Sequence, residues 1–169
     1  NAATPLVHEL LRRHPNLRIL ITTMTPTGSD RVVNTFGDSV GHSYAPYDYS
    51  FAVQRFLNRV RPGVLVLIET EIWPNTIHLC SVRNVPVVML NVRLSEKSRR
   101  NYQRIAWLSR PILHRIQRFG AQSEKHRQRL IDLGVQPSAV HRTGSMKFEI
   151  KLAAGVREVA EAVRQGWGR

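Results

Sequence analysis

One stretch decides the fold: Val64-Leu65-Val66-Leu67-Ile68-Glu69-Thr70-Glu71-Ile72-Trp73-Pro74. Its first five residues are apolar and follow Arg61-Pro62-Gly63, a pattern typical of a strand buried in a parallel sheet. Pro74 suits the first turn of a following helix, because a proline loses no hydrogen bond there. Ligands of such sheets bind beyond the carboxyl ends of the strands. Glu69 and Glu71 therefore mark a candidate site at a strand tip.

The alternation of strands and helices continues on both sides of this stretch. Strands are expected at about residues 17–22, 41–45, 64–69, 85–90, 119–122 and 140–143. Helices are expected at about 4–13, 27–33, 51–60, 74–83, from 95, and at 110–117, 123–133 and 151–165. This pattern predicts an α/β fold, in which a Rossmann-like parallel sheet is flanked by helices and joined by right-handed crossovers. Since the chain opens on a helix rather than a strand, we expect a fragment.

Several polar side chains are candidates for the ends of these helices. Capping of a helix N-terminus is expected from Thr4, from Thr27 or Ser29, from Asp48 or Ser50, and from Ser123. Gly134 suits the left-handed position after the last turn of the 123–133 helix.

The composition narrows the class of protein. A chain of 169 residues is enough for one domain of ordinary size. A single cysteine, Cys80, excludes a disulfide framework and is expected to be a buried, inert thiol. The seven histidines show no metal-binding spacing, so no metal is expected. We find no signal peptide and only strand-sized apolar runs, which fits a reducing, cytoplasmic setting.

The charge is strongly positive and unevenly placed. The formal net charge is +13, of which +2 belongs to residues 1–84 and +11 to residues 85–169. Residues 93–129 hold eleven Lys and Arg against Glu96 and Glu124. Such a surface attracts nucleic acid, an anionic membrane face or a phosphorylated substrate. A solvated surface that aids solubility is an equally good interpretation.

The loop Thr23-Met24-Thr25-Pro26-Thr27-Gly28-Ser29-Asp30 follows the first strand and opens a helix. Its hydroxyls, glycine and free N–H groups could hold an anion or a sugar hydroxyl. The loop lacks the Gly-Lys-Ser/Thr of a P-loop. Capping of the helix is the alternative, and the two roles can coexist.

The carboxylates of the central stretch have two possible roles. Glu69 or Glu71 could act as an acid or base, or stabilise positive charge that develops in a reaction. Alternatively a carboxylate could cap the helix that starts near Pro74, where the helix dipole favours it. Trp73 could stack on a ligand, although packing is the commoner role of an isolated tryptophan.

Two further strands end in polar segments. Arg93, in Asn91-Val92-Arg93-Leu94-Ser95, could bind a phosphate or carboxylate through two hydrogen bonds, or simply belong to the basic surface. Lys147, in Gly144-Ser145-Met146-Lys147-Phe148-Glu149, would bring a positive charge to the same edge of the sheet.

Five stretches together resemble the amino-terminal domain of bacterial 3-deoxy-D-manno-octulosonic acid (Kdo) transferases. In order they are residues 22–32, Tyr44-Ala45-Pro46-Tyr47-Asp48, Glu69-Thr70-Glu71-Ile72-Trp73-Pro74-Asn75, Asn91-Val92-Arg93-Leu94-Ser95 and Gly144-Ser145-Met146-Lys147-Phe148-Glu149. The resemblance covers residues 1–150. It implies one half of a two-domain GT-B glycosyltransferase, with residues 151–169 a helical tail or the start of the interdomain region, and the first strand missing upstream.

The resemblance also implies a function. The family moves Kdo from CMP-Kdo to the phosphorylated lipid A precursor, without a cofactor or metal, at the cytoplasmic face of the bacterial inner membrane. This half would bind the acceptor and the anionic membrane surface, and a carboxyl-terminal domain would bind CMP-Kdo. No nucleic acid is expected. Because the family's general base, a glutamate, would lie upstream of Asn1, we expect this chain alone to be inactive.

Particular residues match the family's site positions. Glu69 and Lys147 correspond to residues that stabilise the transition state. Acceptor contacts are implied for Thr25, Thr27, Gly28, Ser29, Glu71, Trp73, Asn75, Arg93 and Ser95. The alternatives are a basic nucleic-acid-binding module, for which no motif is present, and another GT-B transferase that uses a sugar nucleotide.

Overall fold

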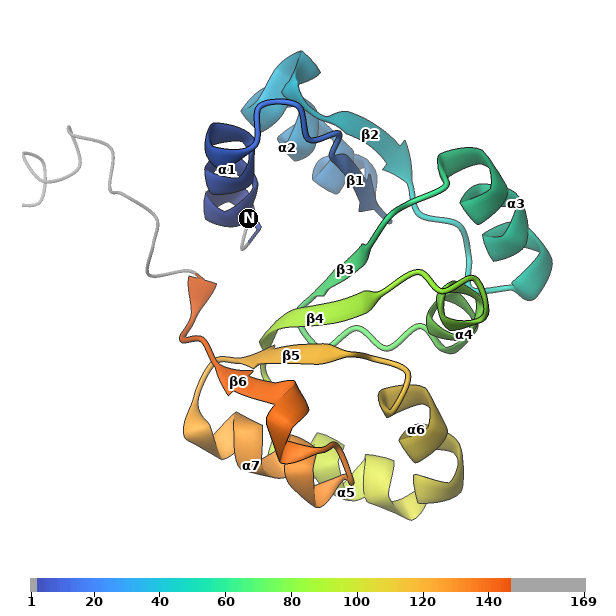
Figure 1. The fold of residues 1–169 in the computed structure, drawn as a ribbon, viewed down its shortest axis with the longest axis vertical. Coiled ribbons are helices and arrows are strands. Elements are labelled where there is room, and N and C mark those ends of the chain that lie inside the picture. Colours follow the sequence, from blue (N-terminus) through green and yellow to red (C-terminus); the bar gives the residue numbers. More distant parts are fainter. Residues whose placement is uncertain (1–2, 147–169) are drawn as a thin grey trace, which may run out of the picture.

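The computed structural model describes residues 3–146, and the predicted helix at 151–165 lies outside them. The helices are α1 (Thr4–Arg13), α2 (Pro26–Phe36), α3 (Ser50–Val60), α4 (Pro74–Val82), α5 (Glu96–Arg104), α6 (Ala106–Leu113) and α7 (Glu124–Asp132), with short 3₁₀ helices η1 (Gly37–Ser39) and η2 (Pro137–Ala139). The strands are β1 (Leu20–Thr23), β2 (Gly41–Tyr44), β3 (Leu65–Ile68), β4 (Val87–Val92), β5 (Arg118–Ala121) and β6 (Val140–Arg142). Figure 1 shows their arrangement.

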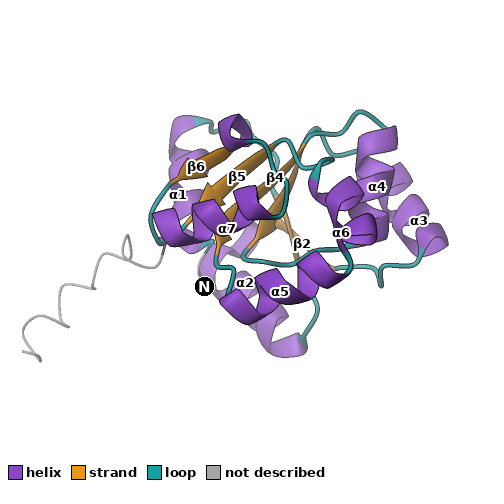
Figure 2. Cartoon of the chain, turned by 90° about the horizontal axis from the view of Figure 1, so that it is seen from below, coloured by secondary structure: helices purple, strands orange, loops and turns teal. Residues whose placement is uncertain are grey.

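All strand pairs are parallel, which confirms the predicted α/β class. The strands form two sheets, β1-β2 and β3-β4-β5-β6, rather than the single sheet expected from the sequence. Leu20 pairs with Gly41 in the first sheet, and Leu65 pairs with Val87 in the second. Helices cover the four-stranded sheet, with α5, α6 and α7 on the side seen in Figure 2.

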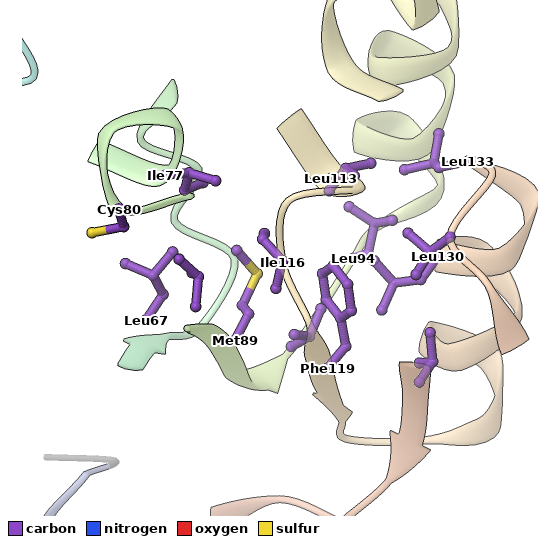
Figure 3. Packing of buried hydrophobic residues seen from close by; sticks show 14 of the residues in the cluster. Leu67, Ile77, Cys80, Met89, Leu94, Leu113, Ile116, Phe119, Leu130 and Leu133 are labelled. Carbon is purple, nitrogen blue, oxygen red and sulfur yellow. The ribbon is translucent and has the colours of Figure 1, made fainter. Parts of the chain in front are cut away.

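Each sheet has its own hydrophobic core. In the larger core, Phe119, Met89 and Leu94 are fully buried between the four-stranded sheet and its helices (Figure 3). Burying each such side chain contributes about 1.5–3 kcal/mol. Cys80 belongs to this core, which confirms the prediction that it is buried, and burial raises the pKa of its thiol.

The smaller core lies between α1, α2 and the two-stranded sheet. It consists of Val7, Val32, Phe36 and Val40, with Ile19 and Ile21 of the β1 segment partly buried against it. Val7 comes from α1, and Val32 and Phe36 come from α2. The helices α1 and α2 therefore cover the same face of β1.

The strand that opened our sequence analysis is less buried than its composition predicts. Only Leu67 of β3 is buried, and it belongs to the larger core. Val64 and Val66 are 50% and 40% exposed. The prediction of a strand buried throughout is wrong for these residues, because β3 is an edge strand that pairs only with β4 among residues 3–146.

Several predicted helix caps differ from the structure. Ala3 is the N-cap of α1 instead of Thr4, and Tyr49 precedes α3, so neither helix has a side-chain cap. Ser123 stands at the N-cap of α7 without a capping hydrogen bond. Gly134 has φ +97°, as predicted for the residue after a helix. Helix α6 begins earlier than expected and contains Pro111.

Asp48 joins the two sheets. It follows β2, but its carboxylate accepts hydrogen bonds from the N–H groups of Asn75 (2.9 Å) and Thr76 (2.8 Å) and from Thr76 Oγ1 (2.7 Å). The Asn75 side-chain amide also donates to the Asp48 carbonyl (2.6 Å). Asp48 thus satisfies the first turn of α4 and ties the loop after β2 to the helix after β3.

Candidate functional site

The tips of β3 and β4 are held together by one threonine. Thr70 Oγ1 donates to the Arg93 carbonyl (2.8 Å) and accepts from the Arg93 N–H (3.1 Å). These two bonds fix the backbone beside Glu69 against the backbone that presents Arg93. Both side chains are exposed, so Glu69 and Arg93 offer a carboxylate and a guanidinium at one edge of the sheet.

Both tips have a backbone conformation that L residues rarely adopt. Glu69 has φ +69° and Asn91 has φ +58°. Asparagine tolerates this left-handed region better than glutamate does. A non-glycine residue held there costs on the order of 1–3 kcal/mol, and such residues cluster at functional sites. The conformation turns the chain at Glu69 immediately after its N–H bonds to the Leu90 carbonyl (2.8 Å).

Asn91 is fully buried at a shift in the β4–β5 register. Its carbonyl accepts from Gln122 Nε2 (3.1 Å), and its Oδ1 accepts from the Met146 N–H (3.3 Å). Its Nδ2 has no hydrogen-bond partner among residues 3–146. Asn91 therefore positions the segment after β6, which leads to Lys147. Sequence reasoning missed this role, although an asparagine after a buried strand is compatible with a left-handed turn.

Glu71 does not cap the helix that follows it. Its Oε2 accepts from the Trp73 indole N–H (3.1 Å), and α4 has no cap from its own N-cap residue because Asp48 fills that role. Trp73 is partly buried against the larger core, which confirms packing as one of its roles. The capping alternative is thereby wrong for Glu71, and within residues 3–146 Glu69 makes no capping hydrogen bond to α4 either.

Asn75 is engaged at both ends of its side chain. Its Nδ2 donates to the Asp48 carbonyl, and its Oδ1 accepts from Ser50 Oγ (3.0 Å). Asn75 was predicted to contact a ligand. In the structure its side chain joins the start of α4 to Asp48 and to Ser50 at the start of α3.

The turn after β1 is capped differently from the prediction. Thr25, rather than Thr27 or Ser29, is the N-cap of α2, and its Oγ1 accepts from the Gly28 N–H (3.1 Å). Pro26 occupies the first helical position, so Thr27, Gly28 and Ser29 form the first turn. A Cβ on residue 28 would lie 3.1 Å from Thr25 Oγ1 and 3.2 Å from Thr23 Cβ, which explains the glycine.

Ser95 opens α5 as an N-cap and accepts from the Ser98 N–H (3.0 Å). The loop before it is fixed to α7, since the Leu94 carbonyl accepts from His126 Nδ1 (3.0 Å) and Arg129 Nη1 (2.7 Å). Arg99, Arg100 and Arg129 converge on Glu96. The hydrogen bond from Arg99 is the main reason why the pKa of Glu96 falls to about 2.

The structure brings together some of the predicted site residues and not others. Glu69, Glu71, Trp73 and Arg93 belong to the tips of β3 and β4. The Thr25–Ser29 turn belongs to the other sheet, and no recorded hydrogen bond within residues 3–146 joins it to Glu69 or Arg93. Lys147 lies outside the described residues. No cluster of three potential metal-binding side chains is present in the described part of the chain.

Comparison with known proteins identifies a family. The profile of the family described as 3-deoxy-D-manno-octulosonic-acid transferase (kdotransferase) matches residues 1–150. A 3-deoxy-D-manno-octulosonic acid transferase of Haemophilus influenzae is 39% identical over 98% of this chain, and one of Bordetella pertussis is 33% identical over 99%. The chain spans only 39% and 40% of the lengths of these two relatives.

Solved structures of low sequence identity share the fold. A UDP-GlcNAc 2-epimerase from Neisseria meningitidis, bound to UDP-GlcNAc, matches 95% of this chain and 48% of its own, with a TM-score of 0.61 and 14% identity. The corresponding enzyme of Rickettsia bellii matches 96% of this chain and 46% of its own, with a TM-score of 0.58 and 14% identity. The predicted Rossmann-like α/β fold, one half of a GT-B architecture, is confirmed.

Proposed function

Since the chain belongs to the family of 3-deoxy-D-manno-octulosonic acid transferases, we propose that it is the acceptor-binding half of such an enzyme. The intact protein would transfer Kdo from CMP-Kdo to the phosphorylated lipid A precursor. Residues 1–150 would form the acceptor domain, and residues 151–169 would lead toward a second domain that binds CMP-Kdo. The observation that carries this proposal is the pairing of the Glu69 and Arg93 tips through Thr70, because it combines two family motifs at one sheet edge.

We assign the acceptor to the polar groups around this edge. Arg93 is exposed and has no ion-pair partner among the described residues, so it is available for a phosphate or carboxylate. Glu71, which Trp73 holds in place, can accept hydrogen bonds from sugar hydroxyls. Thr25, Thr27, Gly28, Ser29, Asn75 and Ser95 remain proposed members of this acceptor surface.

Glu69 would act on the reaction itself. Transfer of the sugar develops positive charge at the anomeric centre of the donor and negative charge on its leaving phosphate. The Glu69 carboxylate would stabilise the positive charge, and Lys147 would stabilise the negative charge. The Glu69 carboxylate has no hydrogen-bond or ion-pair partner in residues 3–146, so no other group of this part of the chain already engages its charge. The general base would be supplied by the polypeptide that precedes this chain.

A corner of the surface fits an anionic membrane. Ile105, Trp107 and Leu108, where α5 meets α6, are 42%, 79% and 45% exposed. The flanking Arg104 and Arg110 are also exposed. Exposed Trp beside basic residues suits the interface of a bilayer that carries negative lipids, where the acceptor would be found. No helix in the described part of the chain is long and apolar enough to cross a membrane.

Glu69→Gln in the intact enzyme tests the proposal. Loss of one electrostatic group that acts in the transition state lowers kcat by about 10²–10³-fold. Glu71→Gln is the comparison variant. It keeps an acceptor for the Trp73 indole and, as a proposed acceptor contact, should act on KM for the acceptor while changing kcat by less than about fivefold. Transfer from CMP-Kdo to the lipid A precursor is measured, with urea unfolding to check stability. Equal rates for Glu69→Gln and wild type would refute the role of Glu69.

A further inference from the structure

Three of the four tyrosines lie in one short segment at the end of β2. Tyr44, the last residue of β2, is 53% exposed, and Tyr47 and Tyr49 are 72% and 63% exposed. The fourth, Tyr102, is partly buried against the larger core. Exposed aromatic side chains that gather in one place indicate a binding surface, whereas scattered ones do not.

The backbone of this segment is fixed on both sides. The Ala45 N–H donates to the Thr23 carbonyl (2.9 Å), which joins the segment to the end of β1. Three residues later, Asp48 bonds to the first turn of α4. Figure 1 shows the loop running from β2 past α4 to α3. The tyrosines therefore stand on a fixed backbone, and such side chains lose little conformational entropy when they bind a ligand.

The contacts of Tyr44 direct it toward the Thr25–Ser29 turn. Tyr44 pairs in register with Thr23, so both side chains stand on the same face of the sheet. Helix α2 covers this face, because Val40, four residues before Tyr44, is buried in the smaller core with α2. Thr23 faces the first turn of α2, since a Cβ on residue 28 would lie 3.2 Å from Thr23 Cβ. Tyr44 thus stands beside the turn.

His42 holds the Tyr44 ring in place. The two rings meet edge-on, with centroids 5.7 Å apart and an interplanar angle of 75°. His42 Nε2 is hydrogen-bonded to Thr23 Oγ1 (3.0 Å). The Tyr44 hydroxyl makes no recorded hydrogen bond within residues 3–146, so both ring and hydroxyl are available to a ligand. The rings of Tyr49 and Phe51 instead stack on each other (6.0 Å, 6°).

The charge of the surroundings indicates the class of ligand. Residues 23–30 and 41–50 contain no Lys or Arg, and the first turn of α2 offers hydroxyl groups. A pyranose ring presents C–H groups on its face and hydroxyls around its edge, so it fits an aromatic ring beside hydroxyls. A bilayer of negative lipids or a nucleic acid would require basic residues, and these flank the corner of α5 and α6 instead.

We propose that Tyr44, positioned by His42, stacks on a pyranose ring of the acceptor beside the Thr25–Ser29 turn. This inference rests on the proposed function and adds a residue that determines which acceptor binds. A ring that stacks equally well before and during transfer contributes to acceptor affinity and leaves the chemical step unchanged.

Steady-state kinetics of the intact enzyme test the inference. Tyr44→Ala should raise KM for the lipid A precursor about tenfold, and should leave kcat and KM for CMP-Kdo within about twofold of wild type. Tyr44→Phe keeps the ring, so its KM should stay within about threefold of wild type. Phe51→Ala is the matched control, because Phe51 is 75% exposed and stacks on Tyr49, and its KM should not change. Tm is measured for each variant. If Tyr44→Ala lowers Tm, Tyr44→Leu, which keeps an apolar side chain on the strand, should show the same rise in KM.

A competitor made from the precursor by removing its lipid chains separates sugar from lipid. Its inhibition constant should also rise about tenfold in Tyr44→Ala, and an unchanged constant would overturn the assignment to a sugar ring. Equal losses in Tyr44→Ala and Phe51→Ala would overturn it as well, since they would assign the whole aromatic segment to a bilayer. An unchanged KM in Tyr44→Ala, with an active wild type, refutes this inference alone. A wild-type enzyme that transfers no Kdo to the precursor refutes the proposed function, and the inference falls with it.

Discussion

Replacing Asp48 by alanine should destabilise the fold more than loss of an ordinary helix cap does. The partly buried carboxylate accepts three hydrogen bonds, from the Asn75 N–H, the Thr76 N–H and Thr76 Oγ1. An N-cap alone contributes about 0.5–2 kcal/mol, and a hydrogen bond to a charged group about 1.5–3 kcal/mol. Since such contributions are not additive, we expect Asp48→Ala to lower the free energy of unfolding by about 3 kcal/mol. The helix α4 and the link between the sheets would be lost together.

Urea unfolding followed by circular dichroism measures this change. Asp48→Asn keeps one acceptor oxygen and should lose about 1–1.5 kcal/mol. Asp30→Ala is the matched control, because this exposed aspartate of α2 makes no recorded ion pair, and it should stay within about 0.5 kcal/mol of wild type. For a chain of this size, 3 kcal/mol lowers Tm by about 6–12 °C. An unfolding free energy for Asp48→Ala within about 0.5 kcal/mol of wild type would refute the bridging role.

Three further predictions concern charge, membrane binding and backbone strain. The pKa of Glu96 is lowered from its ordinary value of 4.5 to about 2. Its ion pairs therefore stabilise the fold fully above about pH 4.5, and this stabilisation is lost as the pH falls toward 2. The difference in urea midpoint between wild type and Glu96→Gln should vanish over that range. Trp107→Ser should weaken binding to phosphatidylglycerol vesicles, measured by co-sedimentation, at least severalfold. It should not change Tm, because Trp107 is 79% exposed. Unchanged binding would contradict the proposed membrane contact. Glu69→Gly should leave the unfolding free energy equal or up to about 1 kcal/mol higher, since glycine adopts φ +69° freely; a clear loss of stability would argue against strain at this residue.

The positions of the strands followed from the sequence because they depend on local patterns. Apolar runs and the flanking Gly and Pro residues placed all six strands within a few residues of those observed. Cys80 and Gly134 were also predicted correctly, since burial of a small apolar side chain and a left-handed C′ residue are local signals.

The capping residues were harder to predict from the sequence, because their hydrogen-bond partners are distant along the chain. Asp48 was one of two caps predicted for the helix that follows it, with Ser50 as the alternative, and it instead caps a helix that begins 26 residues later, at Pro74. Thr70 was not singled out, although its hydroxyl joins two strand tips 23 residues apart. The exposure of Val64 and Val66 depends on which elements surround β3, and the composition of one strand does not contain that information.

The strained tips give the strongest physical reason to place function at this edge. Glu69 and Asn91 end neighbouring strands, and both have positive φ. A turn alone is made most easily by glycine, which has no steric cost there. Glutamate adds a cost on the order of 1–3 kcal/mol, and its side chain makes no hydrogen bond or ion pair in residues 3–146 that would offset this cost. The carboxylate is therefore poorly explained by folding, and this supports the proposal that its charge serves binding or transfer.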